Sequence, residues 1–278
     1  MAMMRQREWK RTAKMVCVFL VGIVTGLIAQ PIVRPTEVGA RFLKDAIGAM
    51  RQFSIDARVA EAREKVDLEM ARLEWEIAAT HAFHEFARTV WVANEKFRRS
   101  AKDPQSRGQY AQSFGMGYSQ YAQAIGIAYS SWMQARSQAF QRCQQELNAA
   151  WNALQSALNQ NLQRAQQGIQ QLTEAPKPIA FADLLEAHPL AFGEPEVEYR
   201  KVLEEAANGF VKELREITLA HRKEVARFAR PDVDIDEADN ALRKANKKWL
   251  EAALDALDNY RRACHAVLRK YKTKLEGD

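Results

Sequence analysis

Two histidines and a glutamate in the first half of the chain have the residue types and the spacing that chemistry would need. His81 and His84 are three positions apart, so on a helix both lie on one face. Imidazoles at this spacing can bind one transition-metal ion, and Glu85 follows directly. A metal enzyme that uses His81 and His84 is therefore one hypothesis for this chain.

The residues expected opposite this pair argue against a metal site. A reversal of the chain at residues 102–104 would bring residues 118–123 alongside His84, and that stretch contains no His, Cys, Asp or Glu. We therefore interpret both histidines as hydrogen-bonded core residues. The sequence also has no Gly-rich phosphate loop, no Gly-x-Ser-x-Gly and no His-Glu-x-x-His motif. We expect no enzyme activity, no cofactor and no resident metal.

The composition predicts an all-α protein. The chain has 278 residues, of which 47% are apolar and 27% charged, so it can bury a sizeable core. Only 12 Gly and 8 Pro leave few turn signals, which argues against a fold of many short strands. Cys17, Cys143 and Cys264 are too few and too far apart for a disulfide framework or a Cys-x-x-Cys zinc site. Whether Cys143 and Cys264 pair is left open.

The N-terminal segment predicts a membrane anchor. Residues 15–33 contain no charged side chain, and a helix needs about 20 such residues to cross a bilayer. Residues 1–14 form a basic flank with five Lys or Arg against Glu8. This flank favours a cytoplasmic N-terminus, with the rest of the chain exported to the periplasm or an equivalent compartment.

A secretory signal is the alternative interpretation of residues 15–33. Cleavage after Ala29 would place Leu27 where a small residue is preferred, which favours an anchor or an uncleaved signal. Within this segment Gly22 and Gly26 are four residues apart, a spacing that lets two membrane helices pack closely.

Residues 38–172 are predicted to form a long antiparallel helical hairpin. Residues 38–100 contain no Pro, and Asp103 with Pro104 suits the start of a new helix. Large apolar residues of the first helix recur at steps of four, four and three. They are Ile55, Val59, Ala62, Val66, Met70, Leu73 and Ile77, followed in the same register by His81 and His84.

The second helix of this hairpin contains a tandem repeat of eleven residues. QYAQSFGMGYS at 109–119 is followed directly by QYAQAIGIAYS at 120–130, with seven of eleven positions identical. An eleven-residue period corresponds to about 3.67 residues per turn and predicts one nearly straight helix of about 60 residues, about 90 Å long. We expect its large side chains to form the main hydrophobic core with the first helix.

The surface of this second helix is unusual. None of the 28 residues from Gly108 to Ala135 is charged, whereas an exposed helix usually carries Lys and Glu. Its glutamines make it too polar to cross a bilayer, so we interpret this surface as covered by protein, most economically by a second copy. A merely Gln-rich exposed helix is the alternative. The predicted interface residues are Tyr110, Gln112, Phe114, Tyr118, Gln120, Tyr121, Gln123, Ile125, Tyr129 and Trp132.

The C-terminal part is predicted to be a second, shorter hairpin. Residues 173–195 hold four of the eight prolines and predict a linker, and residues 196–278 contain two further helix patterns. The last helix has ten Lys or Arg within 241–274, which we interpret as a solvated face, with an anionic lipid as the alternative. Nucleic acid is not an expected partner, because no recognition motif accompanies the charge.

These features predict a membrane-anchored helical scaffold or an accessory subunit of a larger membrane or envelope complex. Its partners would be lipid, through residues 15–33, and itself or other subunits of the complex. A lipid-active or pore-forming helical protein is the alternative, because eleven-residue repeats also occur in helices that lie on lipid surfaces.

Overall fold

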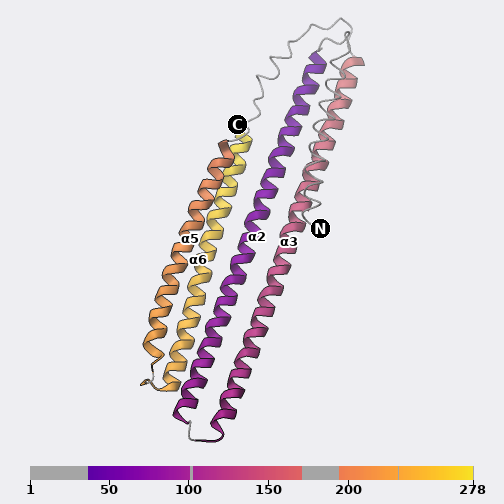
Figure 1. Ribbon diagram of the computed structural model, residues 1–278. Coiled ribbons are helices and arrows are strands. Elements are labelled where there is room, and N and C mark those ends of the chain that lie inside the picture. Colours follow the sequence, from indigo (N-terminus) through magenta and orange to yellow (C-terminus); the bar gives the residue numbers. More distant parts are fainter. Residues whose placement is uncertain (1–36, 101–102, 171–193, 231, 278) are drawn as a thin grey trace. The chain divides into compact units, whose positions relative to one another are not determined.

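The computed structural model describes residues 37–100, 103–170, 194–230 and 232–277. These residues contain four helices and no strand, which confirms the all-α prediction (Figure 1). The helices are α2 (Glu37–Arg99), α3 (Ser106–Gln170), α5 (Glu194–Phe228) and α6 (Ile235–Gly277). As the eleven-residue period predicts, α3 is one helix, of 65 residues.

The predicted membrane anchor at residues 15–33, with Gly22 and Gly26, lies outside the described residues, as does nearly all of the linker at 173–195. Among the helices that are described, none has an apolar stretch sufficient to cross a bilayer. The anchor and its topology therefore stay predictions.

Aspartate side chains mark the starts of α3 and α6. An oxygen of Asp103 accepts a hydrogen bond from the backbone N–H of Gln105 at 3.0 Å. Asp234 accepts two, from the N–H groups of Asp236 at 2.9 Å and Glu237 at 3.1 Å. The bonds to Asp234 satisfy backbone donors that the first turn of α6 leaves free, whereas the bond to Asp103 holds the residue that directly precedes α3. The bonds to Asp234 also hold its pKa below the usual range.

The described chain falls into two compact units. The first comprises residues 37–53 and 151–170, and the second comprises 54–150, 194–230 and 232–277. In the first unit Phe53 and Trp151 meet edge to face, with ring centroids 5.8 Å apart. Ala46 and Leu154 are buried there.

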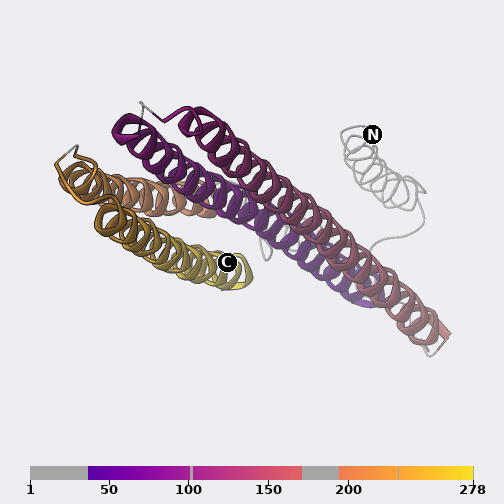
Figure 2. The same cartoon turned by 90° about the horizontal axis from the view of Figure 1, so that it is seen from below.

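A hydrophobic core cluster of the second unit joins α2 to α5 and α6. Figures 1 and 2 show the ribbons of these helices. The apolar line of α2 predicted from the sequence packs here, whereas we expected it to pack against the second helix of its own hairpin. Leu257 and Cys264 of α6 are its most deeply buried large side chains. The buried members from α2 are Ile55, Val59, Ala62, Val66, Met70, Leu73 and Ile77, and α5 contributes Phe210.

The contact between α2 and α3 uses small residues. Four alanines recur every eleven residues on α2 and are all buried: Ala60, Ala71, Ala82 and Ala93. On α3 the corresponding line is Gly117, Ala128, Ala139 and Ala150. Gly117 lies so close to α2 that an added Cβ would be 2.8 Å from the Cγ2 atom of Thr89. We call this contact the α2/α3 seam.

Between residues 110 and 132 the large side chains of α3 lie along the edge of this seam and not at its centre, contrary to our expectation. Farther along the predicted line, Cys143 and Leu154 are buried. Trp132 lies against Trp75, with centroids 6.2 Å apart, and Tyr121 stacks on Phe86 at 5.5 Å. Small residues occupy the line nearest α2, so the buried face is rotated by about one residue from the predicted line. The helices can then approach closely, which large side chains on that line would prevent.

Ion pairs hold the part of the seam beyond the uncharged stretch of α3. Arg142 donates to Asp67 at 2.7 Å, and Arg63 of α2 pairs with Glu146. Arg142 and Glu146 of α3 thus attach this part of the helix to α2.

Replacing Gly117 by Ala should destabilise the protein. The new methyl group would press on Thr89, whose hydroxyl is held by a hydrogen bond to the carbonyl of Glu85 at 3.0 Å. The expected loss of unfolding free energy is about 1–3 kcal/mol, measured by urea unfolding. Gly126→Ala is the matched control, because no atom lies within 4 Å of its added Cβ. It should raise stability by about 0.5–1 kcal/mol. Equal effects of the two changes would contradict the close seam.

Candidate functional site

Two imidazoles stack on each other inside the second unit. His84 of α2 and His221 of α5 have ring centroids 4.2 Å apart and planes 25° apart. Trp249 of α6 meets His84 edge-on at 4.7 Å. The Nδ1 atom of His84 is buried and has no hydrogen-bond partner in the described part of the chain. The predicted core role of His84 therefore agrees with its position, but its predicted hydrogen bond is not formed at Nδ1.

A chain of polar groups continues from this stack across the three helices. Asn246 of α6 accepts from His221 Nε2 at 2.9 Å and donates to Glu85 of α2 at 2.7 Å. Because the amide oxygen can only accept, Nε2 of His221 carries the proton. Glu85 accepts from Arg88 at 3.0 Å, and Arg88 pairs with Asp239 of α6. We call these five residues, His221, Asn246, Glu85, Arg88 and Asp239, the polar chain.

The environment of the stack keeps the histidines of α2 neutral. Burial, followed by the neighbouring imidazole of His221, lowers the pKa of His84 from 6.5 to about 4. Burial also lowers the pKa of His81, while Glu85 acts in the opposite direction. Both shifts disfavour the charged imidazolium.

The two histidines of the metal hypothesis face different surroundings. His84 is enclosed by His221 and Trp249, whereas His81 lines a groove along α2 and α3. No group of three or more His, Cys, Asp or Glu among the described residues could hold a metal ion.

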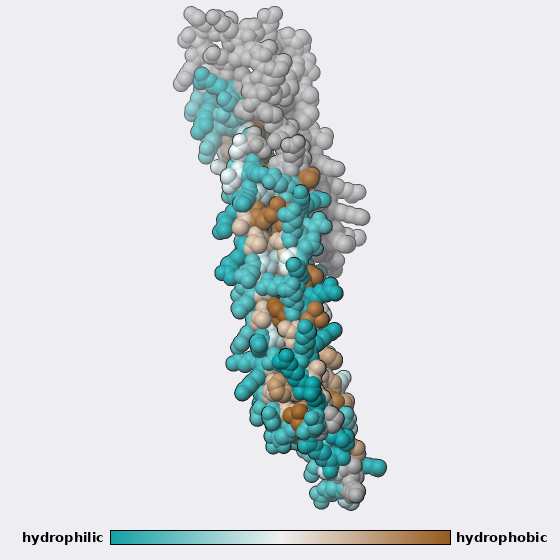
Figure 3. Space-filling view, turned by 90° about the vertical axis from the view of Figure 1, so that its left-hand side faces the viewer, coloured by the Kyte–Doolittle hydropathy of each residue, from teal (hydrophilic) through white to brown (hydrophobic). Residues whose placement is uncertain are grey.

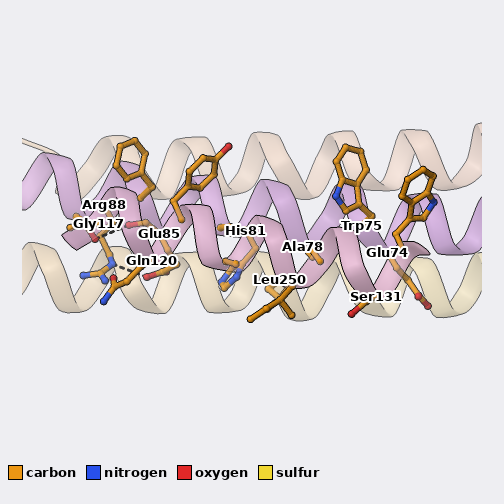
Figure 4. Close-up of a pocket in the computed structure, with 18 of the residues that line it drawn as sticks. Glu74, Trp75, Ala78, His81, Glu85, Arg88, Gly117, Gln120, Ser131 and Leu250 are labelled. Carbon is orange, nitrogen blue, oxygen red and sulfur yellow. Dashed lines mark hydrogen bonds and ion pairs between the residues drawn. The ribbon is translucent and has the colours of Figure 1, made fainter. Parts of the chain in front are cut away.

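The groove that includes His81 has a volume of about 660 Å³. It runs along α2 and α3, and Leu250 of α6 forms part of its lining (Figure 4). Its carboxylates are already paired: Glu85 belongs to the polar chain and Glu74 pairs with Arg261.

Two of the three cysteines are described, and both are free and buried. Burial raises the pKa of Cys143 to about 12 and also raises that of Cys264. The thiols are thus held protonated, and in this structure they do not pair.

The predicted interface residues of α3 fall into two groups. Tyr110, Tyr121, Ile125 and Trp132 are half-buried beside the seam. The others, Gln112, Phe114, Tyr118, Gln120, Gln123 and Tyr129, are exposed. The large apolar members are well exposed, with 58% of Tyr118 and 49% of Tyr129 accessible.

Three further apolar residues of α3 were missed by the sequence analysis, Met116, Ile127 and Met133, of which Met133 is 41% exposed. Met116 and Ile127 are 58% and 61% exposed. They occupy equivalent positions of the tandem repeat, eleven residues apart, so both lie on one line along the helix. Their equivalent positions in the repeat could have indicated from the sequence that both residues lie on the same face.

The pairing of His84 with His221 was also missed. It had no sequence signal, because the pair joins α2 to α5 across more than a hundred residues. The alanine line of α2 did have a signal, namely its own period of eleven residues.

Comparison of the chain with known protein families, with curated proteins and with solved structures finds no match in any of the three.

Acid should destabilise this protein through His84. Its pKa is about 4 in the folded chain and about 6.5 when unfolded, so the unfolded chain takes up this proton first as the pH falls. The free energy of unfolding should fall between pH 6.5 and pH 4, by up to about 3 kcal/mol. Above pH 6.5 this residue contributes no slope.

His84→Phe tests this assignment, because it keeps an aromatic ring beside Trp249 and cannot titrate. Urea unfolding from pH 7.5 to pH 4 should show a flatter dependence for His84→Phe than for the wild type. His265→Gln on the exposed surface of α6 is the control. A pH dependence of His84→Phe as steep as that of the wild type would refute the role of His84.

Proposed function

We propose that this protein is a membrane-anchored helical scaffold, or an accessory subunit of a larger membrane complex, that acts by protein assembly and not by catalysis. Residues 15–33 anchor it, and the helices that follow are exported. The exposed surface of α3 between residues 108 and 135 is its assembly site.

One observation carries this proposal: a 28-residue stretch of helix has no charge and exposes large apolar side chains. We define the outer face of α3 as the exposed residues on the side away from α2, together with the two edges of that side. Tyr118 and Ile127 belong to the edges, because Tyr118 lies 6.3 Å from the ring of Phe86 of α2 and Ile127 lines the groove along α2 and α3. Its large apolar members are Met116, Tyr118, Ile127, Tyr129 and Met133. Such a contiguous apolar surface is typical of a binding site.

The other helices differ from this stretch. Exposed Lys, Arg, Asp and Glu occur along the whole length of α5 and α6. Seen from the side of α5, the surface is mainly hydrophilic, with scattered hydrophobic side chains (Figure 3). A solvated surface therefore explains α5 and α6, whereas the outer face of α3 favours a covering partner.

The carboxylates and thiols inside the second unit are paired or buried. The polar chain and the groove both offer carboxylates, but each is already bound to Arg or Asn. The two described thiols are buried.

Cross-linking in the membrane tests the proposal. The full-length chain would be treated with a lysine-reactive cross-linker in its native membrane, before extraction, and its adducts identified by mass spectrometry. We expect a discrete adduct that falls at least tenfold in Ile127→Asp, because a charge would then be buried at the contact. Val211→Asp on α5 is the matched control, since both residues are 61% exposed.

An adduct that is absent in the wild type, or unchanged in Ile127→Asp, would contradict assembly through α3. If the purified chain released dye from liposomes and Ile127→Asp abolished that release, lipid would be the partner and the scaffold proposal would fail.

A further inference from the structure

We infer that the outer face of α3 binds the same face of a second copy anchored in the same membrane, with the two α3 helices parallel and in register. This inference rests on the proposed function, because it names the partner of the same site.

The outer face has its large and small residues in separate lines. Tyr118 and Tyr129 form one line, and Met116 and Ile127 form another on the opposite edge, because each pair is eleven residues apart. Between these lines lie the small exposed residues Gly108, Ala111, Gly115, Ser119, Ala122, Gly126 and Ser130. The exposed side chains of Gln112, Gln123 and Met133 lie beside them. A helix partner can therefore approach the centre closely and contact large side chains on both edges.

Two glycines on the outer face show that no other described part of the same chain blocks a partner helix there. A Cβ added to Gly115 or Gly126 would meet no atom within 4 Å. On the opposite side of the helix, a Cβ added to Gly117 would collide with Thr89 of α2. On that side of α3, a line of small residues flanked by aromatic side chains packs against another helix, α2.

Charge favours a second copy over another partner. A partner helix would have to cover about 40 Å of α3, the length of 28 residues, without leaving its own charges buried and unpaired. The longest uncharged stretch in this sequence is that same segment of α3. Two copies meet this requirement for each other, since neither brings a charge to the contact.

The chain that precedes the described residues favours a parallel arrangement. The predicted anchor ends at residue 33, and α2 begins at Glu37. In two copies the same number of residues separates the membrane from any given position of α3. A two-fold axis perpendicular to the membrane then places each residue beside its own equivalent.

Anchoring also supplies affinity that this contact needs. One helix pair of about 40 Å buries less surface than the roughly 1,600 Å² of a standard interface. Confinement to one membrane raises the effective concentration of the second copy, so a modest contact suffices.

Cysteine cross-linking of the full chain tests this arrangement. Ala122→Cys would be introduced into the protein, which is then reconstituted in phosphatidylcholine vesicles at high lipid excess and mildly oxidised. We expect a covalent dimer on a non-reducing gel. Ala149→Cys is the matched control, because Ala149 is also an exposed alanine of α3 but lies outside the uncharged stretch. Dimer should form at least tenfold faster with Ala122→Cys than with Ala149→Cys.

A second change separates loss of contact from loss of fold. Gly126→Glu in the Ala122→Cys chain should abolish the dimer, because a charged side chain would enter the centre of the contact. It should not lower the unfolding temperature, since Gly126 has open space and Glu favours helix more than Gly does. Dimerisation that survives Gly126→Glu would overturn the inference.

Other outcomes distinguish this inference from the proposed function. Equal dimer formation by Ala122→Cys and Ala149→Cys would overturn the inference, as would none from Ala122→Cys. Cross-links in mixtures of Gly115→Cys with Gly126→Cys, but with neither variant alone, would show an antiparallel pair and refute the parallel one. If an Ile127-dependent adduct with a different protein formed in the native membrane, the scaffold function would stand while the second copy would be excluded.

Discussion

Eleven residues complete three turns of an α-helix, and the described helices depend on this constraint. A residue type that recurs every eleven positions stays on one line of a nearly straight helix, however long that helix is. In α2 two such lines coexist: a line of large apolar residues meets α5 and α6, and a line of alanines meets α3. One helix can therefore serve two different neighbours without a bend.

Side-chain size determines how each neighbour packs. Against α5 and α6, large residues such as Leu257 and Phe210 fill the space between helices. Against α3, Gly117 and the alanines let the backbones approach, so large side chains cannot lie at the centre and are displaced to the edges. The exposed tyrosines of α3 are thus a consequence of the close seam. Only small residues lie on the contact line between α2 and α3, so no large side chain there covers the tyrosines.

Much of this structure could be predicted from the sequence, but the choice of neighbours could not. The approximate helix limits and the turn at Asp103 follow from local rules, and the period follows from the tandem repeat. From hydrophobicity alone, we predicted that the large residues of α3 make its contact with α2. The alanines were overlooked because a small residue has little hydrophobic signal, although its value for close approach is high. Pairing of His84 with His221 depends on tertiary packing that no local pattern encodes.

A repeating apolar line also raises a problem of register, and the polar chain resolves it. If α6 slid by eleven residues along α2, apolar residues would again meet apolar residues over most of the contact. The bonds from Glu85 to Asn246 and from Arg88 to Asp239 would then be lost, which leaves buried polar groups unpaired. Buried polar groups often reduce stability, but they specify a single alignment because misaligned states lose more. The imidazole of His84 is a further buried polar group of this kind, and the core tolerates it only while it is uncharged.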